Sequence, residues 1–396
     1  MESLGISTGQ AGTGISEQQR LKKLREHLVE LCLVQGPIPF ALYMELCLYH
    51  PQLGYYTAGP PPMGRHGDYL TYPSVHPAFG RLMGRQVVQI WRLMGEPPGF
   101  TLVEMGGGKG LLCHHMLDLI REKAPSFFKG SQVILVDRSH RLLKMQEETL
   151  GEQETVNYMG VEEFQGLPPM VGCIVSNELV DAMPVHLVEM RSGKLQEVLV
   201  DVSREGIKEV LAPPTDERIL ELLQSLGAKL IEGQRVEVGL AALEWMEKVA
   251  ESLERGFVMT VDFGYSGQEA FHPLRPAGTL MAYRGHLASP DPYRLPGGQD
   301  ICSHVNFQAL IWAGEKKGLS LVHLIPQDRF LWKMGLLGEM EMLEARRDKM
   351  SPASFWAEKL ALRKLLTPQP PQGGFQVLLQ SKAMDKWDLQ AYSPGP

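Results

Sequence analysis

The most constraining feature of the sequence is a regular alternation of strand-like and helix-like segments that begins near residue 100. Short apolar runs alternate there with longer stretches whose apolar residues recur every three or four positions. Repeated strand–helix–strand units favour a mostly parallel sheet with helices on both faces. We therefore predict an α/β fold with a Rossmann-like sheet, whose strands are expected at 101–105, 132–136, 171–176, 257–263, 320–325 and 375–380.

The rest of the chain is arranged around this sheet domain, which we place at 100–382. Gly, Ser, Thr and Gln dominate residues 1–15, which are predicted to be a disordered N-terminus. Helical periodicity and a long aromatic loop predict a cap region at 16–99. Two further segments are predicted to be insertions in the sheet domain, one with a hairpin and helices and one with helices. The insertions are placed at 185–240 and 327–366, and a flexible tail at 383–396.

Composition excludes several classes of protein. The formal net charge of −7 argues against a nucleic-acid binder whose affinity comes from a cationic surface. The five cysteines contain no closely spaced pair, so neither a disulfide framework nor a metal site is expected. We found no secretory signal, transit peptide or run of about 20 apolar residues. The sequence therefore predicts a cytoplasmic protein without membrane insertion, and it leaves the oligomeric state open.

The sharpest local signal is a glycine-rich turn between the first strand and the helix after it. In a doubly wound sheet this turn is the nucleotide site, because glycines let a ligand approach the backbone closely. A dinucleotide fingerprint would need glycine where Leu111 stands, and a Walker loop would need Ser or Thr at Gly110. The acidic-x-Gly-x-Gly-x-Gly spacing instead resembles motif I of the S-adenosylmethionine (SAM) methyltransferases, with Glu104, Gly106, Gly108 and Gly110 at its defined positions.

Polar residues also follow two later strands. Asp137 ends the second strand, where an acidic residue can accept hydrogen bonds from both hydroxyls of a ribose. Asn177, Glu178 and Asp181 follow the strand at 171–176, so they should face the same crevice as the glycine loop. Two carboxylates there could orient a guanidinium and accept a proton as its nitrogen is alkylated. Alternatively, they could only cap a helix and close a turn.

Three acidic positions outside these turns are also candidates. Asp68 lies in the long loop before the first strand, which could close over a cofactor. Asp262 ends a strand and could face the crevice or bond only to its own turn. Asp300 and His304 would share a helix face if the following helix began early, as a substrate contact or base. An N-cap with a surface histidine is the alternative.

Taken together, the motifs of the chain resemble the MidA family of SAM-dependent methyltransferases. This family includes the mitochondrial arginine methyltransferase that assists assembly of respiratory complex I. The resemblance covers about residues 37–382. It rests on the following segments: Tyr43-Met44-Glu45, Leu48-Tyr49-His50-Pro51, Gly54-Tyr55-Tyr56, Gly67-Asp68-Tyr69, Phe79-Gly80, motif I, Asn177-Glu178-x-x-Asp181-Ala182-x-Pro184, Asp262-Phe263-Gly264-Tyr265, Gly278-Thr279-Leu280, Tyr283-Arg284-x-His286, Gly297-x-Gln299-Asp300 and His304-Val305-x-Phe307.

The resemblance implies a class I methyltransferase sheet with a helical N-terminal region over the cofactor SAM. It implies SAM contacts from Glu104, Gly106, Gly108, Gly110 and Asp137. To these we add Asp68 as a cofactor contact, from its place in the loop, and Asn177, Glu178 and Asp181 as catalytic residues, from their place after the strand. The resemblance also implies methylation of arginine in a protein substrate, with a respiratory-complex subunit as a candidate partner. The family commonly has Gly-Pro-Gly-Arg-Gly in motif I, where this chain has Gly106-Gly107-Gly108-Lys109-Gly110. Two alternatives remain, an NAD(P)-dependent oxidoreductase and a SAM-binding assembly factor without catalysis.

Overall fold

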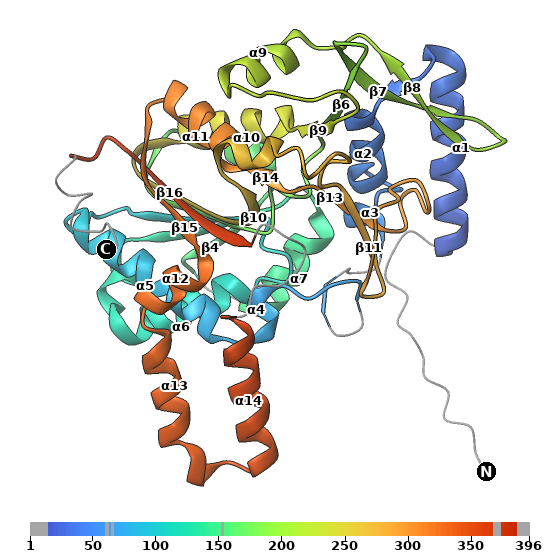
Figure 1. Cartoon of the computed structure of the whole chain (residues 1–396). Coiled ribbons are helices and arrows are strands. Elements are labelled where there is room, and N and C mark those ends of the chain that lie inside the picture. The colour runs from blue at the N-terminus through green and yellow to red at the C-terminus, as the bar shows by residue number, and fades with distance from the viewer. Residues whose placement is uncertain (1–14, 60–62, 65–66, 152–153, 367–373, 386–396) are drawn as a thin grey trace, which may run out of the picture.

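The centre of the molecule is a mixed sheet with helices on both faces. The computed structural model describes residues 15–59, 63–64, 67–151, 154–366 and 374–385. In this part of the chain the sheet has eight strands (Figure 1). Their order is β15 (Leu319–Pro326), β16 (Phe375–Lys382), β10 (Leu253–Tyr265), β5 (Met170–Asn177), β2 (Thr101–Met105), β3 (Gln132–Val136) and β4 (Val156–Met159), with β14 (Val305–Asn306) beside β10.

The direction of the strands confirms the Rossmann-like α/β prediction. From β10 across to β4 every neighbouring pair is parallel. The last strand, β16, lies between β10 and β15 and is antiparallel to both. The carboxyl ends of β2, β3, β5 and β10 therefore meet at one edge of the sheet, which is where ligands bind in folds of this kind.

Alternation of side chains along the central strands builds two separate cores. Leu102 and Cys173 belong to the core on one face, whereas Val103 and Ile174 belong to the core on the other. The first core packs against α5 (Ala78–Leu93), α6 (Leu111–Lys123), α12 (Gln327–Lys333), α13 (Leu336–Ala345) and α14 (Pro352–Lys364). The second core packs against α8 (Val161–Gln165), α9 (Glu217–Ser225), α10 (Leu240–Glu251) and α11 (Phe307–Lys316), while α7 (His140–Leu150) contacts β3 and β4.

Three helices form the N-terminal cap, and a second sheet packs against them, with all of its strands except one coming from residues 186–238. The sheet holds β1 (Ile38–Pro39), β7 (Lys194–Val202), β6 (His186–Arg191), β9 (Arg235–Val238) and β8 (Ile207–Ala212). Its apolar face packs against α1 (Glu17–Gln35) and α2 (Phe40–Tyr49), which precede α3 (Tyr55–Ala58). β6 and β7 pair as an antiparallel hairpin outside the main sheet, as the sequence predicted.

A third sheet and several short helices complete the described part of the fold. The third sheet contains β11 (Met281–Arg284), β12 (Leu287–Ser289) and β13 (Asp300–Cys302). The remaining short helices are α4 (Tyr72–Val75), η1 (Pro125–Lys129), η2 (Gly267–Phe271) and η3 (Arg347–Lys349). In Figure 1, α13 and α14 project from the rest of the molecule. The proposed terminal segments 1–15 and 383–396 lie almost wholly outside the described residues, so their disorder stays a prediction.

One local expectation is wrong. Asp300 and His304 do not share a helix face, because Asp300 begins β13 and α11 begins only at Phe307. Pairing of β13 with β11 draws residues 300–302 into an extended conformation. Asp300 is therefore positioned by strand β13, and His304 lies in the connection between β13 and β14.

Candidate functional site

The glycine-rich turn after β2 is built as its spacing predicted. Gly106, Gly108 and Gly110 all adopt positive φ angles, of 71°, 55° and 78°. The amide of Gly106 donates to the carbonyl of Val136 over 2.8 Å, which fixes the turn against the end of β3. A Cβ atom at Gly106 would lie 2.7 Å from Cδ1 of Leu179. The positive φ angle therefore favours glycine at this position, and an added Cβ atom would also have to displace the end of the Leu179 side chain.

Asp137 lies beside this turn, at the end of β3. Its Oδ1 accepts from the amide of Ser139 over 2.9 Å, and its Oδ2 accepts from Nε2 of Gln146 over 3.1 Å. The same Gln146 nitrogen lies 3.3 Å from the carbonyl oxygen of Gly108, so Gln146 couples the acid to the glycine turn. Burial raises the pKa of Asp137 to about 6. Sequence reasoning missed Gln146, since a buried glutamine on a helix carries no motif.

The glycine turn and Asp137 share one cavity of about 490 Å³, a size typical of small-molecule sites. Its roof comes from the N-terminal cap, through Glu45, Tyr49 and Tyr56. Nη1 of Arg138 donates to Glu45 over 3.1 Å, and its guanidinium carbon lies 4.4 Å from the ring centre of Tyr49. The cap is therefore tied directly to the residue that follows Asp137.

Glu178 is held in a strained turn at the end of β5. Its φ angle is 51°, an unusual value for a residue with a side chain, and such strain is typical of functional sites. Its Oε1 accepts from the amide of Tyr72 over 3.2 Å and from Nδ2 of Asn177 over 3.0 Å. Burial raises the pKa of Glu178 to about 8. The side chain is thus fixed by the residue before it and by a distant segment of the chain.

Asp262 holds the same turn in place by accepting hydrogen bonds from its backbone. One of its oxygens accepts from the backbone amides of three successive residues, which are Leu179, Val180 and Asp181, at 3.2, 2.9 and 3.3 Å. Its side chain is fully buried. Asp262 lines none of the three cavities of the site, and it bonds to its own turn through the amide of Phe263 as well as to the turn that carries Glu178 and Asp181. Neither interpretation that the sequence allowed describes this positioning role.

Four carboxylates meet in a second cavity of about 260 Å³, which we call the acidic pocket. They are Asp68, Glu178, Asp181 and Asp300, and tyrosines surround them. Tyr56 donates to Oδ1 of Asp300 over 2.7 Å. Burial raises the pKa of Asp300 to about 6, and burial together with the neighbouring carboxylates raises the pKa of Asp181. Crowded, buried carboxylates of this kind are stabilised by a bound cation.

Asp68 belongs to the acidic pocket and does not line the cavity of the glycine turn. Its Oδ2 accepts from the hydroxyl of Tyr55 over 2.6 Å, and its Oδ1 accepts from the amide of Gly285 over 2.7 Å. These bonds join the aromatic loop to the turn between β11 and β12. The structure therefore separates Asp68 from the other residues for which a cofactor contact was predicted.

Glu104 and Asn177 line a third cavity, of about 240 Å³, on the other side of the glycine turn. Oε2 of Glu104 and Oδ1 of Asn177 are buried without a hydrogen-bond partner among the described residues. Burial raises the pKa of Glu104 to about 8. Glu178 and Tyr69 line all three cavities, so the three spaces meet at these two side chains.

This arrangement of a glycine turn, a strand-end acid and an acidic pocket matches a known family. The family model of S-adenosyl-L-methionine-dependent methyltransferases matches residues 82–325. The chain belongs to this methyltransferase family. SAM is its cofactor, and the resemblance to the MidA family is confirmed. The methyltransferase prediction is thereby confirmed over the alternative of an NAD(P)-dependent oxidoreductase.

Individual proteins are similar to this methyltransferase over most of its length. The mitochondrial protein arginine methyltransferase NDUFAF7 homolog of Drosophila melanogaster is 30% identical over 347 residues, covering 81% of this chain and 77% of the relative. NDUFAF7 of Danio rerio is 26% identical, with coverages of 83% and 80%. A candidate methyl transferase of Burkholderia thailandensis, solved with S-adenosyl-homocysteine, has a TM-score of 0.82 and 29% identity, covering 97% and 98% of the chains.

The relatives also correct one expectation. The predicted cytoplasmic location is wrong, because the NDUFAF7 relatives are named as mitochondrial proteins. Within the described residues, no helix has the length and apolar character needed to cross a membrane. The same residues contain no group of three or more His, Cys, Asp and Glu that could hold a metal ion.

The cavities of the methyltransferase fit a SAM molecule. SAM combines an adenosine, a sulfonium and an amino acid with a free ammonium, so it needs an apolar slot, ribose acceptors and acceptors for the ammonium. The cavity of about 490 Å³ offers Asp137 and apolar walls that include Val136 and Leu142. The adjoining cavity offers the two buried acceptors without partners, on Glu104 and Asn177. Groups left unpaired in a buried site call for a ligand or water.

Proposed function

We propose that this methyltransferase methylates arginine side chains of a protein. The observation that carries the proposal is the position of the acidic pocket, which opens onto the cofactor cavities at Glu178 and Tyr69. A pocket with four carboxylates and tyrosine walls fits a planar, permanently charged guanidinium. The names of the relatives as protein arginine methyltransferases support the same substrate.

We assign the cofactor contacts as follows. Asp137 accepts hydrogen bonds from the ribose hydroxyls, and the turn of Gly106, Gly108 and Gly110 gives the cofactor room against the backbone. Glu104 and Asn177 accept from the ammonium of the amino-acid part. The roof of Tyr49 and Tyr56 encloses the cavity and excludes water. The cofactor supplies an activated methyl group on a sulfonium.

In this proposal the acidic pocket binds the substrate guanidinium and takes up its proton. Glu178 and Asp181 bind two edges of the guanidinium and direct one nitrogen toward the cofactor cavity. Asp300, held by Tyr56, contributes a third carboxylate. Transfer of the methyl group would break its bond to the cofactor's sulfur, which keeps the electron pair, and would form the new C–N bond. This leaves one excess proton on the substrate nitrogen, and a carboxylate of the pocket takes it up. Alignment and electrostatic stabilisation of this kind supply most of the acceleration in such transfers.

We also propose a mitochondrial protein as the substrate, with respiratory-complex subunits as the first candidates. The mitochondrial relatives support this choice of compartment. The oligomeric state of the enzyme is left open.

A labelling experiment tests the function. The purified protein is incubated with SAM carrying a labelled methyl group and with an extract of mitochondrial proteins, and mass spectrometry then locates the label. We expect label on arginine with the wild type, none with Glu178→Gln, and wild-type labelling with the exposed-site control Glu122→Gln. Calorimetry with SAM checks that Glu178→Gln still binds the cofactor. Label on lysine, or label that persists in Glu178→Gln, would reject the proposal.

A further inference from the structure

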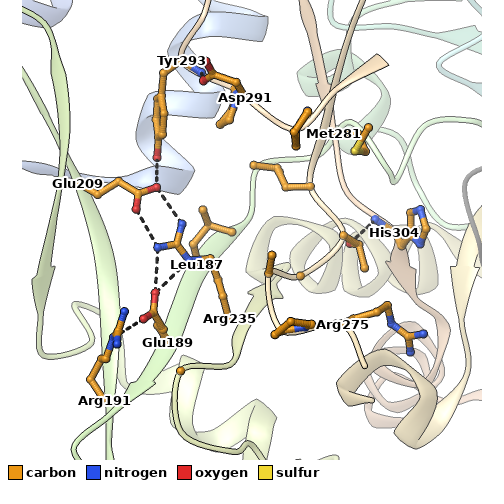
Figure 2. Close-up of a pocket in the computed structure, with 18 of the residues that line it drawn as sticks. Leu187, Glu189, Arg191, Glu209, Arg235, Arg275, Met281, Asp291, Tyr293 and His304 are labelled. Carbon is orange, nitrogen blue, oxygen red and sulfur yellow. Dashed lines mark hydrogen bonds and ion pairs between the residues drawn. The ribbon is translucent and has the colours of Figure 1, made fainter. Parts of the chain in front are cut away.

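A second large cavity, of about 830 Å³, lies outside the methyl-transfer site. It lies between the sheet of β6, β8 and β9 and the segment that runs from Arg275 to Tyr293. Figure 2 shows a charged wall with Glu189, Glu209 and Arg235 and, across from it, His304 and Arg275. We call this space the outer cavity.

The charges on the first wall neutralise one another. Arg235 donates to Glu189 over 2.9 Å and to Glu209 over 2.8 Å, and Tyr293 also donates to Glu209, over 2.9 Å (Figure 2). Arg191 forms a further ion pair with Glu189. Because these groups already bind each other, this wall has little remaining affinity for a charged ligand.

The opposite wall differs because its polar groups lack partners. Nε and Nη2 of Arg275 and both ring nitrogens of His304 are buried, and none has a hydrogen-bond partner among the described residues. The guanidinium carbon of Arg275 lies 3.9 Å from the ring centre of Tyr265. Leaving buried donors of a charged group unpaired is costly, and such groups mark sites for an ion or ligand.

The two free nitrogens of Arg275 define the chemistry of the ligand. Nε and Nη2 lie on one edge of the guanidinium and donate in parallel, the geometry that binds a carboxylate through two hydrogen bonds. Burial and the Arg275 charge lower the pKa of His304 to about 4, so His304 is neutral and offers one N–H donor. Leu187, Met281 and Pro292 add apolar surface to the cavity.

We propose that the outer cavity binds a carboxylate attached to an apolar body, with Arg275 as its anchor. The unpaired nitrogens of Arg275 are buried in the wall, so binding in this proposal requires the side chain to turn its guanidinium toward the cavity that it lines. His304 donates to the same carboxylate, and the apolar body rests against Leu187 and Met281. A free organic acid and the C-terminus of a protein share this chemistry.

Calorimetry with a matched pair of probes tests the proposal. N-acetylphenylalanine carries the carboxylate, whereas N-acetylphenylalaninamide has the same apolar body without the charge. We expect the acid to bind the wild type at least tenfold more tightly than the amide, and Arg275→Gln to abolish this difference. The control Arg191→Gln removes a cation from the opposite wall and should keep it.

A peptide that ends in phenylalanine with a free carboxylate distinguishes the two sources of the ligand. Binding of the peptide as tight as that of the small acid points to a protein C-terminus, and binding of the small acid alone points to a free organic acid. Unchanged melting temperature and SAM affinity of Arg275→Gln confirm that the variant folds. Equal binding of acid and amide, an acid that does not bind at millimolar concentration, or unchanged binding in Arg275→Gln would overturn the proposal.

Discussion

The hydroxyl of Tyr56 donates a hydrogen bond of 2.7 Å to Oδ1 of Asp300, across a separation of 244 residues in the sequence. The Tyr56 ring is fixed independently, because it stacks on Tyr49 with ring centres 5.5 Å apart. The bond therefore connects the cap over the cofactor cavity to a carboxylate of the acidic pocket. It allows the contribution of Asp300 to be tested without disturbing the ring.

We expect Tyr56→Phe to keep the stack on Tyr49 and to release Asp300. Losing a hydrogen bond to a charged group costs about 1.5–3 kcal/mol, so kcat/KM should fall roughly tenfold or more. The SAM dissociation constant should change little. Steady-state kinetics and calorimetry measure the two quantities. Tyr293→Phe is the matched control, since it removes a comparable bond to Glu209 in the outer cavity. Equal kinetic losses in both variants would contradict the role of Asp300.

Substitution in the glycine turn should prevent cofactor binding. Gly106→Ala places a Cβ atom 2.7 Å from Leu179 at a φ angle of 71°. Gly95→Ala is a matched control, because its φ angle is 82° and nothing lies within 4 Å of the new atom. Both variants pay about 1–2 kcal/mol of backbone strain. Only Gly106→Ala should lose measurable SAM binding by calorimetry, and similar affinities for the two variants would count against the assigned cavity.

The stability of the protein without SAM should fall as the pH rises from 6 to 8. In an unfolded chain Glu104 would lose its proton near 4.5, whereas in the folded protein its pKa is about 8. The folded state therefore holds an extra proton between these values, and the free energy of unfolding decreases with rising pH. Melting temperatures at pH 6 and pH 8 measure the effect. The difference should shrink in Glu104→Gln and persist in Glu122→Gln, and a wild type more stable at pH 8 would oppose this account.

Arg138 should contribute to cofactor affinity through the roof of the cavity. Arg138→Lys keeps the charge but loses the fork that binds Glu45 and the planar contact with Tyr49. The SAM dissociation constant should rise about threefold to tenfold, which corresponds to about 1 kcal/mol for a partly exposed contact. Arg346→Lys, which alters an exposed ion pair with Glu358 and lines none of the three cavities, should bind SAM normally. An unchanged affinity of Arg138→Lys would show that the roof is not tied down by this contact.

Local pattern was sufficient to predict the parts of the site that follow from sheet topology. Gly106, Asp137 and Glu178 each come directly after a parallel strand, so their common edge follows from the alternation of strands and helices. The position of Asp300 could not be predicted in this way, because its extended conformation depends on pairing with residues around Tyr283. The hydrogen bonds of Tyr56 with Asp300 and of Gln146 with Asp137 each join residues that do not share a helix or strand, so no local sequence pattern predicts them.

The place of β16 has a consequence for how the protein becomes functional in the cell. Residues 375–382 fill the gap between β10 and β15, so the central hydrogen-bond ladder closes only after these residues have been synthesised. A growing polypeptide on the ribosome would expose the unpaired edges of both strands until that moment. Premature termination anywhere before this strand should therefore give aggregation-prone fragments and no shortened enzyme.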